Sequence, residues 1–82
     1  MDLSVSRVSD VPLGAQLAGK LRAWIQHGGL SPGDRLPSLR EAAQAAGVNL
    51  NTVRTVYARL EHEGLVATEQ GRGTFVSTPG AP

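Results

Sequence analysis

The fold is decided by residues 38–60, which read SLREAAQAAGVNLNTVRTVYARL. Ser38 is followed three residues later by Glu41. This spacing is typical of a capping box at the start of a helix, where each side chain accepts a hydrogen bond from the amide of the other residue. Gly47 suits the left-handed backbone with which many helices end. Four alanines between these points allow a neighbouring helix to approach closely: Ala42, Ala43, Ala45 and Ala46. A short helix that ends at a glycine turn is therefore predicted.

A second helix follows the turn, with one apolar and one polar face. Either Asn49 or Asn51 can cap its start. The apolar stripe falls at i, i+3, i+4 and i+7 and consists of Val53, Val56, Tyr57 and Leu60. The opposite face carries Asn51, Arg54, Thr55 and Ala58. Two short helices around a glycine turn, the second with a polar and basic outer face, predict a helix-turn-helix that suits the major groove of DNA.

A further helix is predicted ahead of this motif. Its apolar stripe begins after Pro12, ends before two glycines and consists of Leu13, Leu17, Leu21, Trp24 and Ile25. On this stripe Trp24 is expected to anchor the core or its edge. Residues 31–34, Ser-Pro-Gly-Asp, predict a type II turn, and the two residues after it allow only a short strand.

A β-hairpin is predicted after the helix-turn-helix. Two β-prone runs, residues 65–69 and 74–77, flank the glycine-rich turn Gln70-Gly71-Arg72-Gly73. Such a turn lets the backbone approach DNA closely and offers one guanidinium to the minor groove or to a phosphate. The predicted fold class is α+β, mainly α: a winged helix-turn-helix of three helices plus a C-terminal β-hairpin wing.

The domain is expected to span residues 11–77. Residues 1–10 have no clear period and are interpreted as a flexible arm, in which Arg7 either touches a phosphate or stays free. Residues 78–82 are rich in proline, glycine and alanine and are interpreted as a linker or a frayed end.

Composition excludes several classes of protein. The 82 residues contain no cysteine, which excludes a disulfide framework and a thiolate zinc site. No apolar run reaches membrane-spanning length and no signal-peptide core is present, so a cytoplasmic protein is expected. The net charge is only +1, but residues 35–59 contain four arginines and one acid, which fits phosphate contact. Because no nucleophile–base pair, metal cluster or phosphate loop is visible, no enzyme activity, cofactor or metal is expected.

Four pieces in register resemble the N-terminal DNA-binding domain of GntR-family bacterial transcription regulators. They are Pro32-Gly33-Asp34-Arg35-Leu36-Pro37-Ser38, Asn51-Thr52-Val53-Arg54, Leu60-Glu61 with Glu63-Gly64-Leu65-Val66, and Gly71-Arg72-Gly73-Thr74-Phe75-Val76. With the first helix, the resemblance covers residues 11–77. The Asn-Leu-Asn-Thr-Val start of the recognition helix and the position of Tyr57 are more similar to the YtrA and MocR branches than to the others.

The resemblance implies a dimer that binds a short palindromic operator, usually to repress transcription, with a separate C-terminal domain that senses a metabolite. Arg40 matches a base or phosphate contact, and Arg35 matches an arginine near the DNA backbone. The full set of candidate DNA-binding residues is Arg35, Ser38, Arg40, Asn49, Asn51, Thr52, Arg54, Gln70, Gly71 and Arg72. Leu39 and Leu50 depart from the family pattern, in which Glu and Arg are common. Leu50 cannot read guanine, although it could touch a thymine methyl.

Some of these side chains have a structural alternative. Asn49 can use its oxygen for capping, and Asn51 is either a cap or an adenine reader. Arg59 lies late in the helix and is either solvated or paired with Glu63 at i+4. Tyr57 is expected in the core.

The alternative function is a winged helix that serves only in protein association, without sequence-specific DNA binding. For a regulator, a homodimer through a C-terminal region absent from this sequence is expected. A YtrA-type protein would add a short helical dimerisation segment, and a MocR-type protein an aminotransferase-like domain with pyridoxal phosphate. A small-molecule effector is expected only where such a further domain exists.

Overall fold

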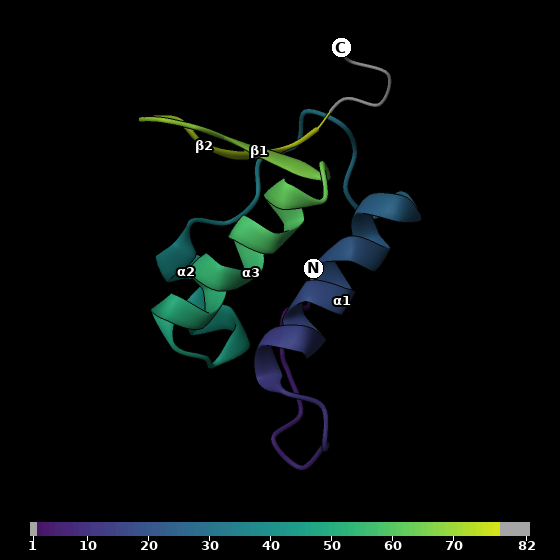
Figure 1. Ribbon diagram of the computed structural model, residues 1–82, viewed down its shortest axis with the longest axis vertical. Coiled ribbons are helices and arrows are strands. Elements are labelled where there is room, and N and C mark those ends of the chain that lie inside the picture. Colours follow the sequence, from purple (N-terminus) through teal and green to yellow (C-terminus); the bar gives the residue numbers. More distant parts are fainter. Residues whose placement is uncertain (1, 78–82) are drawn as a thin grey trace.

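The computed structural model describes residues 2–77 and consists of three helices followed by a two-stranded hairpin (Figure 1). The elements in order are α1 (Leu13–Gln26), α2 (Leu39–Ala46), α3 (Leu50–His62), β1 (Val66–Glu69) and β2 (Gly73–Val76). This arrangement confirms the predicted winged helix-turn-helix. Within residues 2–77, every helix is too short or too polar to span a lipid bilayer.

Local sequence signals determine both ends of α2. The Glu41 amide donates to Ser38 Oγ at 3.1 Å and the Ser38 amide donates to Glu41 Oε1 at 3.0 Å, which confirms the capping box. Gly47 ends the helix with a φ of 71°, in the left-handed region. Of the four alanines expected at the helix–helix contact, three are buried. The prediction was wrong for Ala45, which is exposed because it lies on the solvent side of this short helix.

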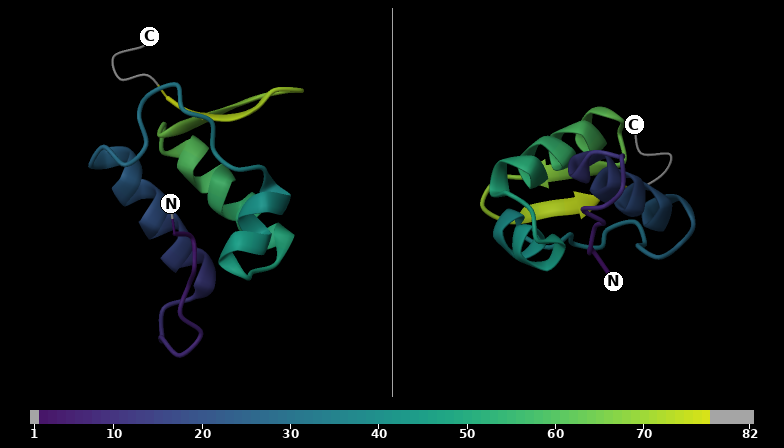
Figure 2. Two further views of the ribbon diagram at one scale, coloured as in Figure 1. Left: turned by 180° about the vertical axis from the view of Figure 1, so that it is seen from behind. Right: turned by 90° about the horizontal axis from the view of Figure 1, so that it is seen from below.

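The core lies between α1 and α3, and α2 closes it on the other side of α3 (Figure 2). The fully buried side chains from these two helices are Leu17, Leu21, Val53 and Leu60. Trp24 is half-buried against this cluster, as expected for an anchor at the edge of the core. Tyr57 is 5% exposed, and its hydroxyl donates to the Pro37 carbonyl at 2.8 Å, so the core prediction is confirmed.

The hairpin pairs antiparallel, with Val66 opposite Val76 and Glu69 opposite Gly73. A third segment joins its β2 side. The Leu36 amide donates to the Thr74 carbonyl at 2.8 Å and the Val76 amide donates to the Asp34 carbonyl at 2.8 Å. The predicted short strand is thus a single bridge, Arg35 to Phe75, directly ahead of α2. This pairing ties the wing to the segment that leads into the helix-turn-helix.

The N-terminal segment contacts α1, although its residues have no clear hydrophobic period. Leu3 is 4% exposed and belongs to the core, and Val5 packs partly buried against it. The Ser6 amide donates to Gln16 Oε1 at 2.7 Å. The expected linker at residues 78–82 lies outside the described residues.

Candidate nucleic-acid interface

The start of α3 is exposed, and Asn49 caps it. Asn49 Oδ1 accepts a hydrogen bond from the Asn51 amide at 2.7 Å, so Asn49 and not Asn51 is the cap. The cap uses the oxygen of Asn49 and leaves its amide nitrogen available to a ligand. The Asn51 side chain is left exposed in the first turn of the helix.

Asn51 and Arg54 form a pair on the outer face of α3. Arg54 Nη1 donates to Asn51 Oδ1 at 2.7 Å, and both residues are exposed. The bond holds the guanidinium beside the first turn of the helix and still leaves four of its five donors free. An exposed amide next to an exposed guanidinium offers hydrogen bonds of the kind that read adenine and guanine edges.

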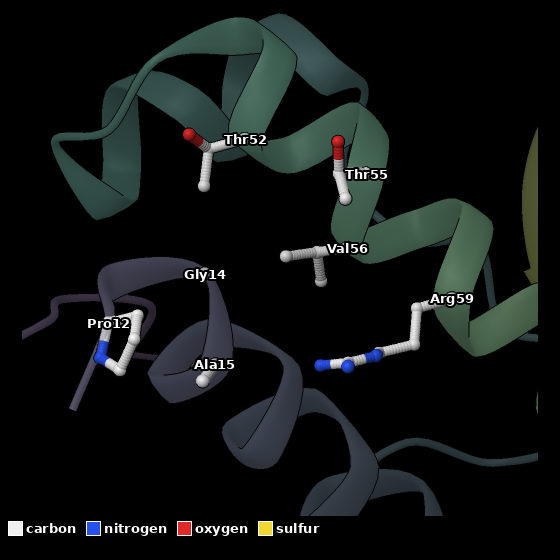
Figure 3. A pocket seen from close by; sticks show the side chains of 7 residues that line it. All are labelled: Pro12, Gly14, Ala15, Thr52, Thr55, Val56 and Arg59. Atoms are coloured by element: carbon white, nitrogen blue, oxygen red, sulfur yellow. The ribbon is translucent and has the colours of Figure 1, made fainter.

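Thr52 lies apart from this pair. It is half-buried and faces α1 across an open cleft of about 490 Å3, with its methyl group turned toward Gly14 (Figure 3). On the α3 side the cleft is lined by Thr52, Thr55, Val56 and Arg59, and on the α1 side by Pro12, Gly14 and Ala15. The structure therefore does not bring Thr52 together with Asn51 and Arg54.

Arg40 and Ser38 lie at the start of α2. Arg40 is exposed in the first helical turn, whereas Ser38 is half-buried and its oxygen is engaged in the capping box. Leu39 packs partly buried against the core, so its apolar side chain has a structural use at this position. The exposed group at this end of α2 is thus the Arg40 guanidinium.

The wing tip carries Gln70, Gly71 and Arg72, all exposed. The Arg72 amide donates to the Glu69 carbonyl at 3.0 Å and closes the turn. The Arg72 side chain is 73% exposed, and its guanidinium lies 3.9 Å from the Glu69 carboxylate, a loose contact that leaves the cation accessible.

Arg35 lies against Gly73 of the wing. A Cβ built on Gly73 would be 2.8 Å from Arg35 Nε, and Gly73 has a φ of 129°. Arg35 also lines a groove of about 390 Å3 between the wing and the start of α2. Arg35 therefore lies beside Gly73 of the hairpin, as an exposed residue that precedes Arg40 and Arg72 along the chain.

Two side-chain contacts between distant parts of the domain were not predicted from the sequence. Glu61 Oε2 accepts from the Thr68 amide at 2.9 Å and joins α3 to the first strand of the wing. Glu63 pairs with Arg22 of α1 at 2.8 and 2.9 Å. Of the two alternatives for Arg59, the exposed, solvated state is the one observed, and Glu63 bonds Arg22 instead. Hydrogen bonds from Arg22 lower the pKa of the Glu63 carboxyl, and the same bonds raise the pKa of Arg22. Arg59 itself faces the cleft beside α1 (Figure 3).

Except for Thr52, which faces α1, the candidate residues belong to elements on one side of the molecule. The tip of the hairpin and α2 lie on the side of α3 away from α1 (Figures 1 and 2). Within residues 2–77 no cluster of His, Cys, Asp or Glu could hold a metal ion. A fold of this kind with a basic face made by two helix starts and a wing defines the class of winged helix-turn-helix domains.

The family follows from residues 13–76, which match the model for "Bacterial regulatory proteins, gntR family". The chain belongs to this family. Family membership identifies a regulatory protein and not an enzyme, as the sequence predicted.

Three known proteins illustrate the similarity. The HTH-type transcriptional repressor YtrA of Bacillus subtilis is 41% identical over 69 residues, which are 84% of this chain and 53% of YtrA. The probable rhizopine catabolism regulatory protein MocR of Rhizobium meliloti is 45% identical over 76 residues, 93% of this chain and 15% of MocR. The DNA-binding domain of AraR, solved in complex with operator ORX1, superimposes with a TM-score of 0.80 at 32% identity and covers 92% of this chain and 93% of that one. The chain thus spans about half of YtrA and much less of MocR.

Proposed function

We propose that this chain is the DNA-binding domain of a bacterial transcription regulator and binds a double-stranded operator in a sequence-specific manner. The observation that carries the proposal is the exposed Asn51–Arg54 pair at the start of α3. Arg40 and Arg72 flank it from α2 and the wing tip. Such a surface suits a base-reading centre between two contacts to the DNA backbone.

Each side chain has a role that its chemistry supports. Arg54 can bind guanine O6 and N7 through two donors, and Asn51 can bind adenine through its amide. Arg40 and Arg72 provide charge for phosphates on either side. Leu50 is 38% exposed at the start of α3 and can contact a thymine methyl. Asn49 contributes through its free amide nitrogen, because its oxygen caps the helix.

We also propose that the full regulator acts as a homodimer on a palindromic operator, in the cytoplasm, and represses transcription. The support is the name of YtrA as a repressor and the share of YtrA, about half, that this chain spans. The remaining half of such a protein is where a dimerisation segment would lie. A two-fold symmetric dimer calls for two half-sites in inverted repeat.

The first prediction concerns Arg54 and Arg72. Selecting bound sequences from a random duplex pool yields the operator, and fluorescence anisotropy then measures affinity over a range of salt concentrations. Arg54→Ala is expected to weaken operator binding by about 1–3 kcal/mol and to relax base preference at one position. Arg72→Ala is expected to weaken all duplexes alike and to reduce the salt slope by about one.

The control is Arg22→Gln, which removes the same charge on the α1 side of the molecule and should bind nearly as the wild type does. If both test variants keep wild-type affinity and salt slope, Arg54 and Arg72 are not part of the interface. If random and selected duplexes bind equally, the domain serves in association and not in operator recognition.

A further inference from the structure

The N-terminal segment is fixed to α1 through polar contacts as well as through Leu3. The amide group of Gln16 bonds both backbone groups of Ser6: its oxygen accepts from the Ser6 amide at 2.7 Å and its nitrogen donates to the Ser6 carbonyl at 2.8 Å. The ammonium group of Lys20 donates to the Ser4 carbonyl. We refer to residues 2–7 as the N-terminal strap. Its backbone is thereby tied to α1 at positions 4 and 6, and Leu3 is buried in the core.

The strap ends at the turn of the helix-turn-helix. Arg7 follows the fixed Ser6 directly, and its Nη2 donates to the carbonyl oxygen of Gly47, the residue that ends α2. In Figure 1 the N-terminal segment and the α2–α3 turn lie at the same end of the molecule. A residue of the strap therefore contacts the turn forty positions further along the chain.

The Gly47 carbonyl has reason to bind a cation. It lies at the C-terminal end of α2, where the helix dipole is negative, and the last turn of α2 has no basic residue of its own. Gly47 also lies two residues ahead of Asn49, the cap of α3. A change in the orientation of this turn is thus passed directly to the first turn of the recognition helix.

We propose that Arg7 is a positioning residue for DNA recognition. Through the Gly47 carbonyl it holds the α2–α3 turn against the strap, and so fixes the start of α3 relative to α1. This inference rests on the proposed function of α3, but it makes a separate claim about the free domain. Arg7 acts through the turn, and a phosphate contact by Arg7 is the competing explanation that the experiment must separate.

The second prediction tests the free protein first. In Arg7→Ala, the amides of residues 47–54 are expected to exchange with solvent about fivefold faster, because a hydrogen bond to a charged group is lost at the turn. Gln16→Ala should have the same effect on these amides, because it releases Ser6 and with it Arg7. Asp10→Ala, at an exposed position outside the strap, should leave them unchanged. Unchanged exchange in Arg7→Ala would overturn the proposal.

Operator titrations then separate the two roles of Arg7. A positioning role lowers affinity about fivefold in both Arg7→Ala and Gln16→Ala and leaves the salt slope at the wild-type value. If Arg7→Ala reduces the slope by about one while Gln16→Ala binds normally, Arg7 is a phosphate contact and the proposal fails. If the wild-type domain binds no duplex at all, the proposed function fails, and the exchange experiment still decides the role of Arg7.

Discussion

At the scale of single residues, Asn49 and Ser38 each cap a helix at a position where DNA contact was also predicted. Both accept a hydrogen bond from a helix amide, and each still has a donor to offer. Their oxygens are thus partly committed to the helix starts, and their donor groups remain for the proposed DNA contact. The side chains of Asn51 and Arg54 do not cap a helix, and the base-reading proposal is therefore based on them.

The third prediction concerns Tyr57. Its hydroxyl is the donor to the Pro37 carbonyl in a part-buried position, so Tyr57→Phe is expected to destabilise the domain by about 1–2 kcal/mol at pH 7. Burial raises the pKa of Tyr57 to about 12, against an ordinary value of 10.0. Between these values the unfolded chain loses its proton before the native state does, so wild-type stability falls as the pH rises.

Tyr57→Phe has no such proton to lose. Urea unfolding at pH 7 and at high pH should therefore show the difference between wild type and variant shrinking on the alkaline side. A difference that stays constant up to pH 12 would contradict the buried, hydrogen-bonded state of Tyr57.

At the scale of secondary-structure elements, the wing is attached on two sides. β2 pairs with β1 and also with residues 34–36, and Glu61 of α3 accepts from the Thr68 amide of β1. Edge strands of a small hairpin have little stability of their own. These additional bonds are what hold the hairpin at one angle to α3.

The fourth prediction concerns Gly73. An added methyl group would lie 2.8 Å from Arg35 Nε on a backbone of φ 129°, so Gly73→Ala is expected to destabilise the domain by about 1–3 kcal/mol. It should also shift the wing amide resonances. Gly64→Ala is the control, because its φ is 80° but nothing lies within 4 Å of the added atom. In an Arg35→Ala background the Gly73→Ala penalty should shrink, and equal penalties in both backgrounds would show that Arg35 exerts no steric effect.

At the scale of the whole molecule, one ion pair joins the first helix to the end of the third. Because Arg22 lowers the pKa of Glu63, the native state holds this carboxyl ionised below its ordinary pKa of 4.5. The pair therefore contributes stability above that pH and loses it as the pH falls through the native value.

The fifth prediction follows from the lowered pKa of Glu63. Thermal unfolding from pH 7 to pH 3 should show a steeper acid loss for the wild type than for Glu63→Gln. Asp10→Asn, at an exposed position without a bonded partner among residues 2–77, should follow the wild-type curve. Parallel curves for the wild type and Glu63→Gln would mean that the contact between Glu63 and Arg22 does not stabilise the domain in solution.

Structural features that depend on nearby residues could be predicted from the sequence. The capping box of Ser38, the end of α2 at Gly47 and the apolar stripe of α3 each depend on neighbours within one or two turns. The sequence was insufficient where partners are distant along the chain. Leu3 has no periodic context, Arg7 meets Gly47 forty positions away, and the choice of Arg22 over Arg59 by Glu63 depends on how the helices pack.

The same distinction applies to the candidate site. The stretch from Asn49 to Arg54 predicted an exposed helix start, and only the packed structure separates Thr52, which faces α1, from the Asn51–Arg54 pair. Arg35 matched a family position, but its contact with Gly73 of the wing joins residues far apart in the sequence.

The extra pairing of β2 with residues 34–36 has a mechanical consequence. That segment runs straight into the Ser38 cap, so main-chain hydrogen bonds connect the hairpin to the start of the second helix. In the proposed complex with DNA, this connection limits how far the helix start that carries Arg40 and the wing tip that carries Arg72 can move apart. A duplex whose flanks deform easily would then be favoured without any additional base contact.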